Sequence, residues 1–258
     1  MIKKDADKII RQRVAPNLFD YCYITTSRHL KNFLSFRDLL AKENRPLMIL
    51  DLGCGYKPFQ KILKEVPIEK YIGVDFDRKR SAADVEAAID DLPFEDSIFD
   101  AAILSEVLEH VPSIDKAVTE LRRVTKNGAL VYLSTPFLLG EHGTPYDFQR
   151  ITQYKYLDLF KNDEILLLRG TNTSLAAPFL INNVVLENIA VLKFIPFLPQ
   201  FLYFCNNILA LLGELTVDVV NATIQTIFYH HKQKITDIFN MYFRTMPGGY
   251  DVIVKIRK

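Results

Sequence analysis

Apolar and polar residues alternate along this chain in blocks that predict strands and helices in turn. Short apolar runs bounded by glycine, proline or acidic residues predict buried strands at 45–53, 71–77, 99–106 and 129–137. Segment 113–128 has the period of an amphipathic helix, with Ser113 as N-cap candidate and Asn127-Gly128 as its exit. Strands alternating with helices predict a mostly parallel sheet that is covered on both faces.

The two ends of the chain follow other patterns. Residues 21–43 place apolar side chains at helical spacing, which predicts one or two N-terminal helices. Residues 171–215 are almost free of charge, and the run 194–215 approaches the length of a membrane span. Its prolines and amides interrupt that run and argue against a true span: Pro196, Pro199, Gln200, Asn206 and Asn207.

Composition excludes some partners. With Lys+Arg 32 against Asp+Glu 31, the net charge of +1 gives no basic stripe for a nucleic acid. Cys22, Cys54 and Cys205 form no CxxC pair, so a disulfide framework or a metal site is not expected, and a reducing compartment fits. The charged N-terminus lacks an apolar signal region, so a cytoplasmic protein is expected.

The segment "ILDLGCGYKP" at 49–58 predicts a tight turn after a buried strand. Gly53 and Gly55 allow close backbone approach, but Pro58 stands where a dinucleotide fingerprint has glycine or alanine. Twenty residues after Gly55, Asp75 ends the second strand and can accept from two ribose hydroxyls. A nucleoside without phosphates fits both facts; an ordinary tight turn with an exposed acid is the alternative.

Four motifs in order give the turn its context: "ILDLGCG", "VDFD", "DDLPFEDSIFDAAILSEVLEHVP" and "LRRVTKNGALVYLSTPF". Residues 47–168 thereby resemble the class I S-adenosylmethionine-dependent methyltransferases. The resemblance implies a Rossmann-like α/β sheet, mostly parallel with an antiparallel last strand, and S-adenosyl-L-methionine as cofactor. It implies these cofactor-binding residues: Asp51, Gly53, Cys54, Gly55, Asp75, Phe76, Asp90, Asp91, Leu92, Ser105 and Glu106. The chain departs from many relatives at Lys57, where they have glycine, and at Ala88, where they have an acid.

The segment "STPFLLGEHGTPYDFQRIT" resembles an acceptor-loop element of a subset of these methyltransferases, many of them associated with glycan or lipid-linked saccharide synthesis. His142 is the candidate base, and His110 in "LEHVP" is a second candidate or a residue that orients the following turn. Tyr146, Asp147 and Arg150 are substrate-binding candidates, although Asp147 and Arg150 can instead form a salt bridge that folds the loop. The pair His230-His231 is expected on a solvated helix.

The resemblance also divides the chain. It implies an N-terminal helical cap (1–46), a cofactor-binding core (47–170), a helical insertion (171–245) and a terminal core strand (246–258). The insertion is expected to roof the acceptor site, as a buried lid, as a peripheral membrane-contacting surface through 194–215, or as a homodimer face. The implied function is O-methylation of a saccharide or lipid-linked acceptor. The alternatives are a quinone- or polyketide-type small molecule and a catalytically silent cofactor-binding scaffold.

Overall fold

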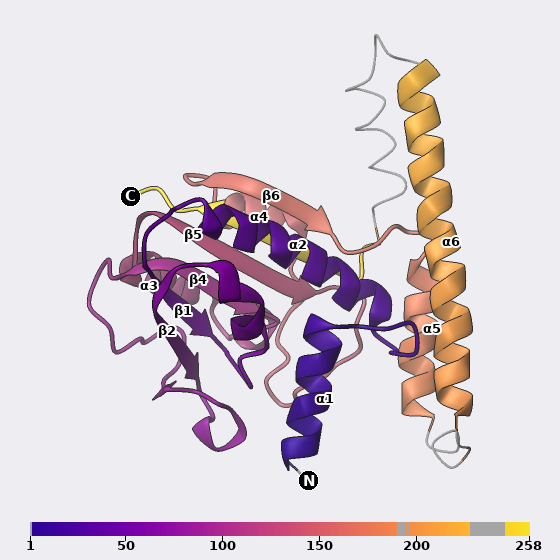
Figure 1. Ribbon diagram of the computed structural model, residues 1–258, viewed down its shortest axis with the longest axis horizontal. Helices are drawn as coiled ribbons and strands as arrows, with labels where there is room; N and C mark the ends of the chain where they lie inside the picture. Colours follow the sequence, from indigo (N-terminus) through magenta and orange to yellow (C-terminus); the bar gives the residue numbers. More distant parts are fainter. Residues whose placement is uncertain (1, 190–194, 196, 228–245) are drawn as a thin grey trace.

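A seven-stranded sheet in the order β3-β2-β1-β4-β5-β7-β6 runs through the centre of the molecule (Figure 1). The computed structural model describes residues 2–189, 195, 197–227 and 246–258. The strands are β1 (Leu47–Leu52), β2 (Ile68–Asp75), β3 (Val85–Glu86), β4 (Phe99–Ser105), β5 (Thr125–Pro136), β6 (Glu164–Gly170) and β7 (Gly249–Lys255). β7 runs antiparallel to both of its neighbours, and the pairs from β3 to β5 are parallel. The predicted sheet, with its antiparallel last strand, is confirmed.

Helices and short 3-10 segments cover both faces of this sheet. On one face, α2 (Tyr23–Ala41) and η1 (Pro58–Glu65) bury Phe33, Phe36 and Phe59 against Tyr132 of β5. On the other face lie α3 (Ile114–Val124) and α4 (Gln153–Leu159), which buries Tyr156. The remaining described elements are α1 (Ile2–Val14), η2 (Arg78–Arg80), η3 (Leu108–His110), α5 (Ala177–Asn188) and α6 (Leu198–Ile227).

The helix predicted at 113–128 has different ends in the structure. It closes at Val124, because Thr125 already has extended backbone and begins β5. Gly128 has the expected left-handed backbone, with φ of 85°, but lies inside that strand. Ser113 is the N-cap residue, as predicted, but its side chain makes no capping hydrogen bond.

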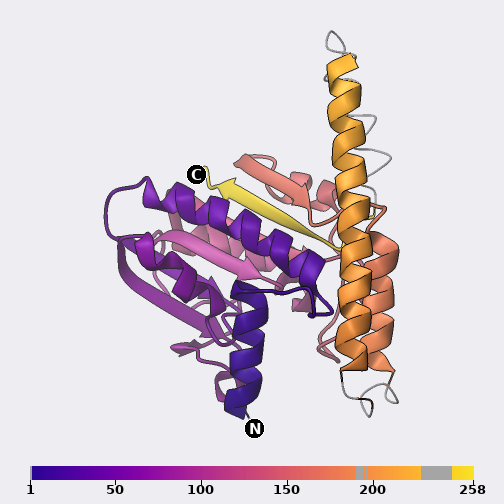
Figure 2. The same cartoon turned by 45° about the vertical axis from the view of Figure 1, so that its right-hand side comes forward.

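In its described residues, the insertion forms the helices α5 and α6, which lie side by side at one end of the sheet (Figures 1 and 2). Pro199, Gln200, Asn206 and Asn207 interrupt the apolar run of the sequence but do not break α6, which is continuous over 30 residues. Pro199 stands in the first turn, where a missing amide hydrogen costs little. Pro196 and His230-His231 lie outside the described residues.

Asn206 and Asn207 of α6 form hydrogen bonds with neighbouring segments. Asn207 donates to the carbonyl oxygens of Leu18 and Asp20, and Asn206 donates to the side chain of Asn183 in α5. These bonds satisfy the buried amides and leave the outward face of the helix apolar. By length and composition alone, Leu198–Thr223 could cross a membrane; 33% of its most apolar window is buried in the structure.

The strand order also locates a crevice. β1 lies between β2 and β4, so the chain leaves β1 toward one side of the sheet and β4 toward the other. In open α/β sheets, ligands bind outside the carboxyl ends of the strands at such a switch point. The glycine turn after β1 and the residues after β4 meet at this place.

Candidate functional site

The turn after β1 depends on its two glycines. Gly53 and Gly55 have φ of 63° and 48°, in the left-handed region that other residues rarely adopt. A side-chain carbon at Gly53 would lie 2.4 Å from Cγ2 of Val107, while one at Gly55 would meet nothing within 4 Å. Gly53 is therefore required for close packing against Val107. Gly55 leaves open space beside the backbone, where a ligand can approach closely.

Asp75, at the end of β2, lies beside this turn. Its carboxylate accepts from the amides of Gly55 and Asp77, at 3.0 Å and 3.2 Å. Lys57, where many relatives have glycine, has a left-handed φ of 52°, and its ammonium group lies 2.6 Å from the Asp84 carboxylate. The turn thus keeps the shape that a third glycine would allow, and the Asp84 ion pair holds the lysine in it.

Asp51 lies beneath the turn rather than in the open crevice. It is buried and accepts a hydrogen bond from the Tyr71 hydroxyl, and burial raises its pKa to about 7. Cys54 is also buried, and burial raises the pKa of its thiol to about 12, which makes it an unreactive packing residue.

The segment that follows β3 is held by α3. Asp90 and Asp91 are exposed, whereas the Leu92 side chain is buried in the core. The Leu92 amide donates to Glu120, and its carbonyl accepts from Arg123 at 2.9 Å. The backbone of this segment is therefore fixed, and only its two acids are accessible to a ligand.

Two residues end β4 at the crevice. The Ser105 hydroxyl lies 2.8 Å from that of Ser134 in β5. Glu106 has a left-handed φ of 58°, and its amide donates to the carbonyl of Ser134. Its Oε1 is buried and has no hydrogen-bond partner in the part of the chain that the structure describes. Strained backbone combined with an unsatisfied polar atom is typical of functional sites.

A cavity of about 210 Å³ opens beside Glu106. It is lined by residues of α1, α2, α5 and the segment after β5, among them Arg13, His29, Leu180 and Leu138. The helical insertion thus forms part of its wall, through α5. This volume suits a small acceptor group.

His29 in the cavity wall belongs to a buried polar group that the sequence reasoning did not identify. Its Nδ1 lies 2.5 Å from Oδ1 of Asp251 in β7, and its Nε2 lies 3.7 Å from Oε1 of Glu106. Tyr132 and Asn32 also donate to Asp251. The one signal in the sequence was the acid within the apolar strand "YDVIVKIRK", since a buried charge needs partners.

Burial lowers the pKa of His29, but the carboxylates of Asp251 and Glu106 outweigh this, and the net shift is upward from 6.5. Arg13 opposes the rise, and the Tyr132 hydroxyl faces the same carboxylate. The arrangement of carboxylate, imidazole and cavity is that of a base oriented by an acid.

The predicted acceptor loop folds over the same end of the molecule. Asp147 and Arg150 form the bidentate ion pair that was weighed as the structural alternative, and Arg150 also donates to the carbonyls of Leu139 and Gly140. This pairing lowers the pKa of Asp147. The Tyr146 ring meets Phe76, the residue after β2, edge-on at 5.8 Å. The loop therefore reaches the cofactor side of the crevice.

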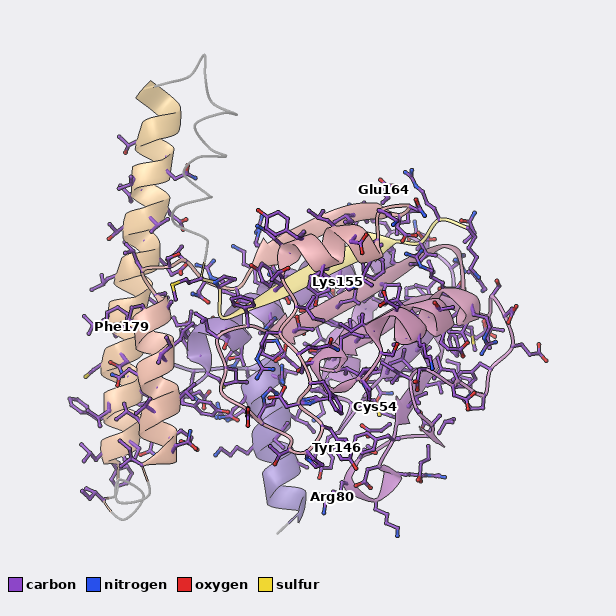
Figure 3. All side chains as sticks on the ribbon, turned by 180° about the vertical axis from the view of Figure 1, so that it is seen from behind. Cys54, Arg80, Tyr146, Lys155, Glu164 and Phe179 are labelled. Atoms are coloured by element: carbon purple, nitrogen blue, oxygen red, sulfur yellow. The ribbon has the colours of Figure 1, made fainter. Side chains whose placement is uncertain are left out.

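Figure 3 shows Tyr146 at the same end of the molecule as Cys54 of the glycine turn, with Glu164 toward the other end.

His110 and His142, the two catalytic candidates, lie together with ring centroids 4.9 Å apart. They are not part of the cavity lined by His29. The structure thus gathers the sequence-predicted residues into the crevice and the loop, and adds His29 and Asp251.

The sheet order, the glycine turn and the strand-end acid define a class I, Rossmann-like methyltransferase fold. Residues 50–133 match the family model described as a methyltransferase domain. This segment is therefore a methyltransferase domain, whose cofactor is S-adenosyl-L-methionine.

Curated relatives match part of the chain. An uncharacterized methyltransferase of Mycobacterium leprae is 35% identical over 107 residues, covering 37% of this chain and 39% of the relative. A malonyl-[acyl-carrier protein] O-methyltransferase of Buchnera aphidicola is 32% identical over 113 residues, covering 40% of this chain and 44% of the relative. The chain thus spans less than half the length of these two relatives.

Among solved structures, a putative sarcosine dimethylglycine methyltransferase from Galdieria sulphuraria matches over 98% of both chains. The TM-score is 0.53 and the sequence identity is 14%. At this sequence identity, the similarity shows a shared fold only.

Proposed function

We propose that the whole chain is an S-adenosylmethionine-dependent O-methyltransferase that acts on a hydroxyl group of a lipid-linked saccharide. The observation that carries the proposal is the meeting of two features at one strand edge. The glycine turn with Asp75 offers a nucleoside site, and the cavity beside Glu106 holds an oriented histidine.

The chemistry requires little beyond alignment and one proton transfer. The sulfonium is a good leaving group, so the protein mainly holds the methyl carbon and the acceptor oxygen in line and excludes water. The oxygen–carbon bond forms as the carbon–sulfur bond breaks, which releases S-adenosylhomocysteine. The hydroxyl proton passes to Nε2 of His29, and Asp251 stabilises the resulting imidazolium. His142 is the alternative base.

The lipid-linked character of the acceptor is supported by the surface that adjoins the cavity. Leu180 and Val184 of α5 line the cavity, while their neighbours Ile181 and Val185 are exposed. Along α6 the exposed apolar side chains continue through Phe201, Leu209, Leu212, Leu215, Val219 and Val220. An apolar surface beside a cavity that contains Arg13, His29 and Glu106 suits a molecule with a sugar at one end and a hydrocarbon chain at the other.

The cofactor part of the proposal predicts that Asp75→Ala weakens binding of S-adenosylmethionine by about 100-fold. Two ribose hydroxyls would lose a charged acceptor, and charge-assisted hydrogen bonds contribute about 1.5–3 kcal/mol each. Calorimetric titration with S-adenosylmethionine and S-adenosylhomocysteine measures this, and NADH should not bind. Asp77→Ala removes a neighbouring carboxylate and should leave the affinity unchanged. Equal affinity in the wild type and Asp75→Ala would contradict the assignment.

The lipid part of the proposal predicts binding to neutral phosphatidylcholine vesicles, measured by flotation. The double variant Phe201→Glu and Leu212→Glu should lose most of the vesicle-bound fraction, because it places charge on the exposed face of α6. Lys116→Glu, on exposed α3 surface, is the matched control. The opposing result is a wild type that fails to float and forms a dimer in solution that the double variant abolishes. This result would assign the exposed face of α6 to contact with a second copy of the chain. Cofactor binding would be unaffected by that outcome.

A further inference from the structure

Three potential metal ligands converge where η3 meets the acceptor loop. Glu109 and His110 end the turn after β4, and His142 comes from the segment after β5. Oε1 of Glu109 lies 3.7 Å from Nε2 of His110 and 3.9 Å from Nε2 of His142. One ligand atom from each of the three residues can be chosen so that all lie within 4.8 Å of one another.

The other nitrogen of each imidazole is occupied by an acceptor. Nδ1 of His110 lies 2.9 Å from the carbonyl oxygen of Tyr146. Nδ1 of His142 lies 3.2 Å from the carbonyl oxygen of Gly140 and 3.3 Å from Oδ2 of Asp147. A ring nitrogen that faces an acceptor carries the proton, so both Nε2 atoms present lone pairs toward Glu109.

Glu109 has no donor to balance this arrangement. Its side chain is fully buried, and neither carboxylate oxygen has a hydrogen-bond partner among the described residues. Burying a carboxylate without donors is costly, and placing two imidazole lone pairs against it adds repulsion. Three electron-pair donors that converge in this way call for a cation between them.

We propose that Glu109, His110 and His142 bind a divalent transition-metal ion of the zinc class. Two histidines and one glutamate are a ligand set of catalytic zinc sites, which leave a fourth position open. Tetrahedral zinc would bring the ligand atoms to about 3.3 Å from one another, which small side-chain rotations achieve from the present distances. The two histidine side chains are 26% and 32% exposed, so the fourth position faces solvent.

The surroundings have the form expected around metal-bound histidines. Such histidines donate their second ring nitrogen to a carboxylate or a backbone carbonyl, and here Asp147 and Tyr146 provide these acceptors. Arg150 in turn fixes Asp147, and Gly143 packs closely against the His110 ring. Tyr146, Asp147 and Arg150 of the loop would therefore orient the metal ligands, whichever acceptor the protein methylates.

The test is a zinc titration of the chelator-treated protein by calorimetry, without cofactor or acceptor. We expect one zinc ion per chain, and at least 100-fold weaker binding in Glu109→Gln and in His142→Asn. Asp147→Asn keeps all three ligands but weakens the Arg150 ion pair and the orientation of His142, and should lose about 10- to 100-fold. Glu141→Gln removes an exposed neighbouring carboxylate and should bind zinc like the wild type. Cobalt(II) in place of zinc should give the visible spectrum of a tetrahedral site.

Two results would overturn the proposal. Absence of stoichiometric zinc binding would mean that a proton on His142 bridges to Glu109 instead. The second result is zinc binding that is unchanged in Glu109→Gln but lost in a double variant of His230→Asn and His231→Asn. It would assign the ion to the His230-His231 pair. Urea unfolding checks that each variant is folded. A parallel titration with S-adenosylmethionine bears on the proposed function alone.

Discussion

Replacing His29 by asparagine is expected to lower the turnover of methyl transfer by about 10²- to 10⁴-fold, the usual contribution of a general base. Asparagine retains a side-chain N–H toward Asp251 but has no basic nitrogen in place of Nε2. The measurement is release of S-adenosylhomocysteine with an alkyl glycoside, which offers sugar hydroxyls on an apolar chain. Binding of S-adenosylmethionine should be unchanged, because His29 lies on the acceptor side of Glu106.

His142→Asn is the matched comparison. If its turnover falls while His29→Asn keeps wild-type turnover, catalysis depends on His142, as base or as metal ligand, and the dyad of His29 with Asp251 has only a structural role. The pH dependence separates the two cases further. With the pKa of His29 raised above 6.5, the neutral base is scarce at low pH, so turnover should rise with pH through a midpoint above 6.5.

The raised pKa of His29 predicts that its contribution to stability decreases as pH rises, opposite to the trend in turnover. A histidine with a raised folded-state pKa contributes stability that is fully present below its unfolded pKa of about 6.5. That contribution is lost as pH rises through the folded-state pKa. The stability difference between the wild type and His29→Asn, from urea unfolding, should therefore be larger at pH 6 than at pH 9. A difference independent of pH would show that the buried imidazole does not titrate with Asp251 and Glu106 around it.

Replacing Gly53 by alanine should destabilise the fold by about 2–5 kcal/mol. The left-handed backbone costs an alanine about 1–2 kcal/mol, and a side-chain carbon 2.4 Å from Val107 adds about 1–3 kcal/mol of overpacking. Urea unfolding measures the loss. Gly55→Ala is the matched variant, since it has the same backbone strain but open space around the new carbon.

Gly55→Ala should therefore cost only about 1–2 kcal/mol of stability. Its effect should appear in cofactor binding, which we expect to weaken by at least about 10-fold, because the new carbon occupies the space where a ligand approaches the backbone. If Gly55→Ala binds S-adenosylmethionine like the wild type, the open space beside this glycine is not the cofactor site.

Local features of the chain were predictable because they depend on residues close in sequence. Alternating apolar runs predicted the strands, and Gly53, Gly55 and Asp75 predicted a nucleoside-binding turn. Errors occurred where tertiary context overrides local preference. The helix expected to reach Gly128 ends at Val124 because Thr125 joins the sheet beside Phe99. The sequence also does not show the hydrogen-bond partners of Asn206 and Asn207, which come from α5 and from the segment before α2.

The sequence by itself determined the order of the motifs, since each is a strand end or a turn with its own local chemistry. The resemblance of these motifs to class I methyltransferases implied the class of fold and the cofactor. Only the tertiary structure decided which side chains meet. His29 and Asp251 are 222 positions apart, and Glu109 and His142 come from different strand ends. Their pairing depends on the packing of α2 on the sheet and on the fold of the acceptor loop. Neither leaves a local pattern, because the contact energies arise between segments that are distant in the chain.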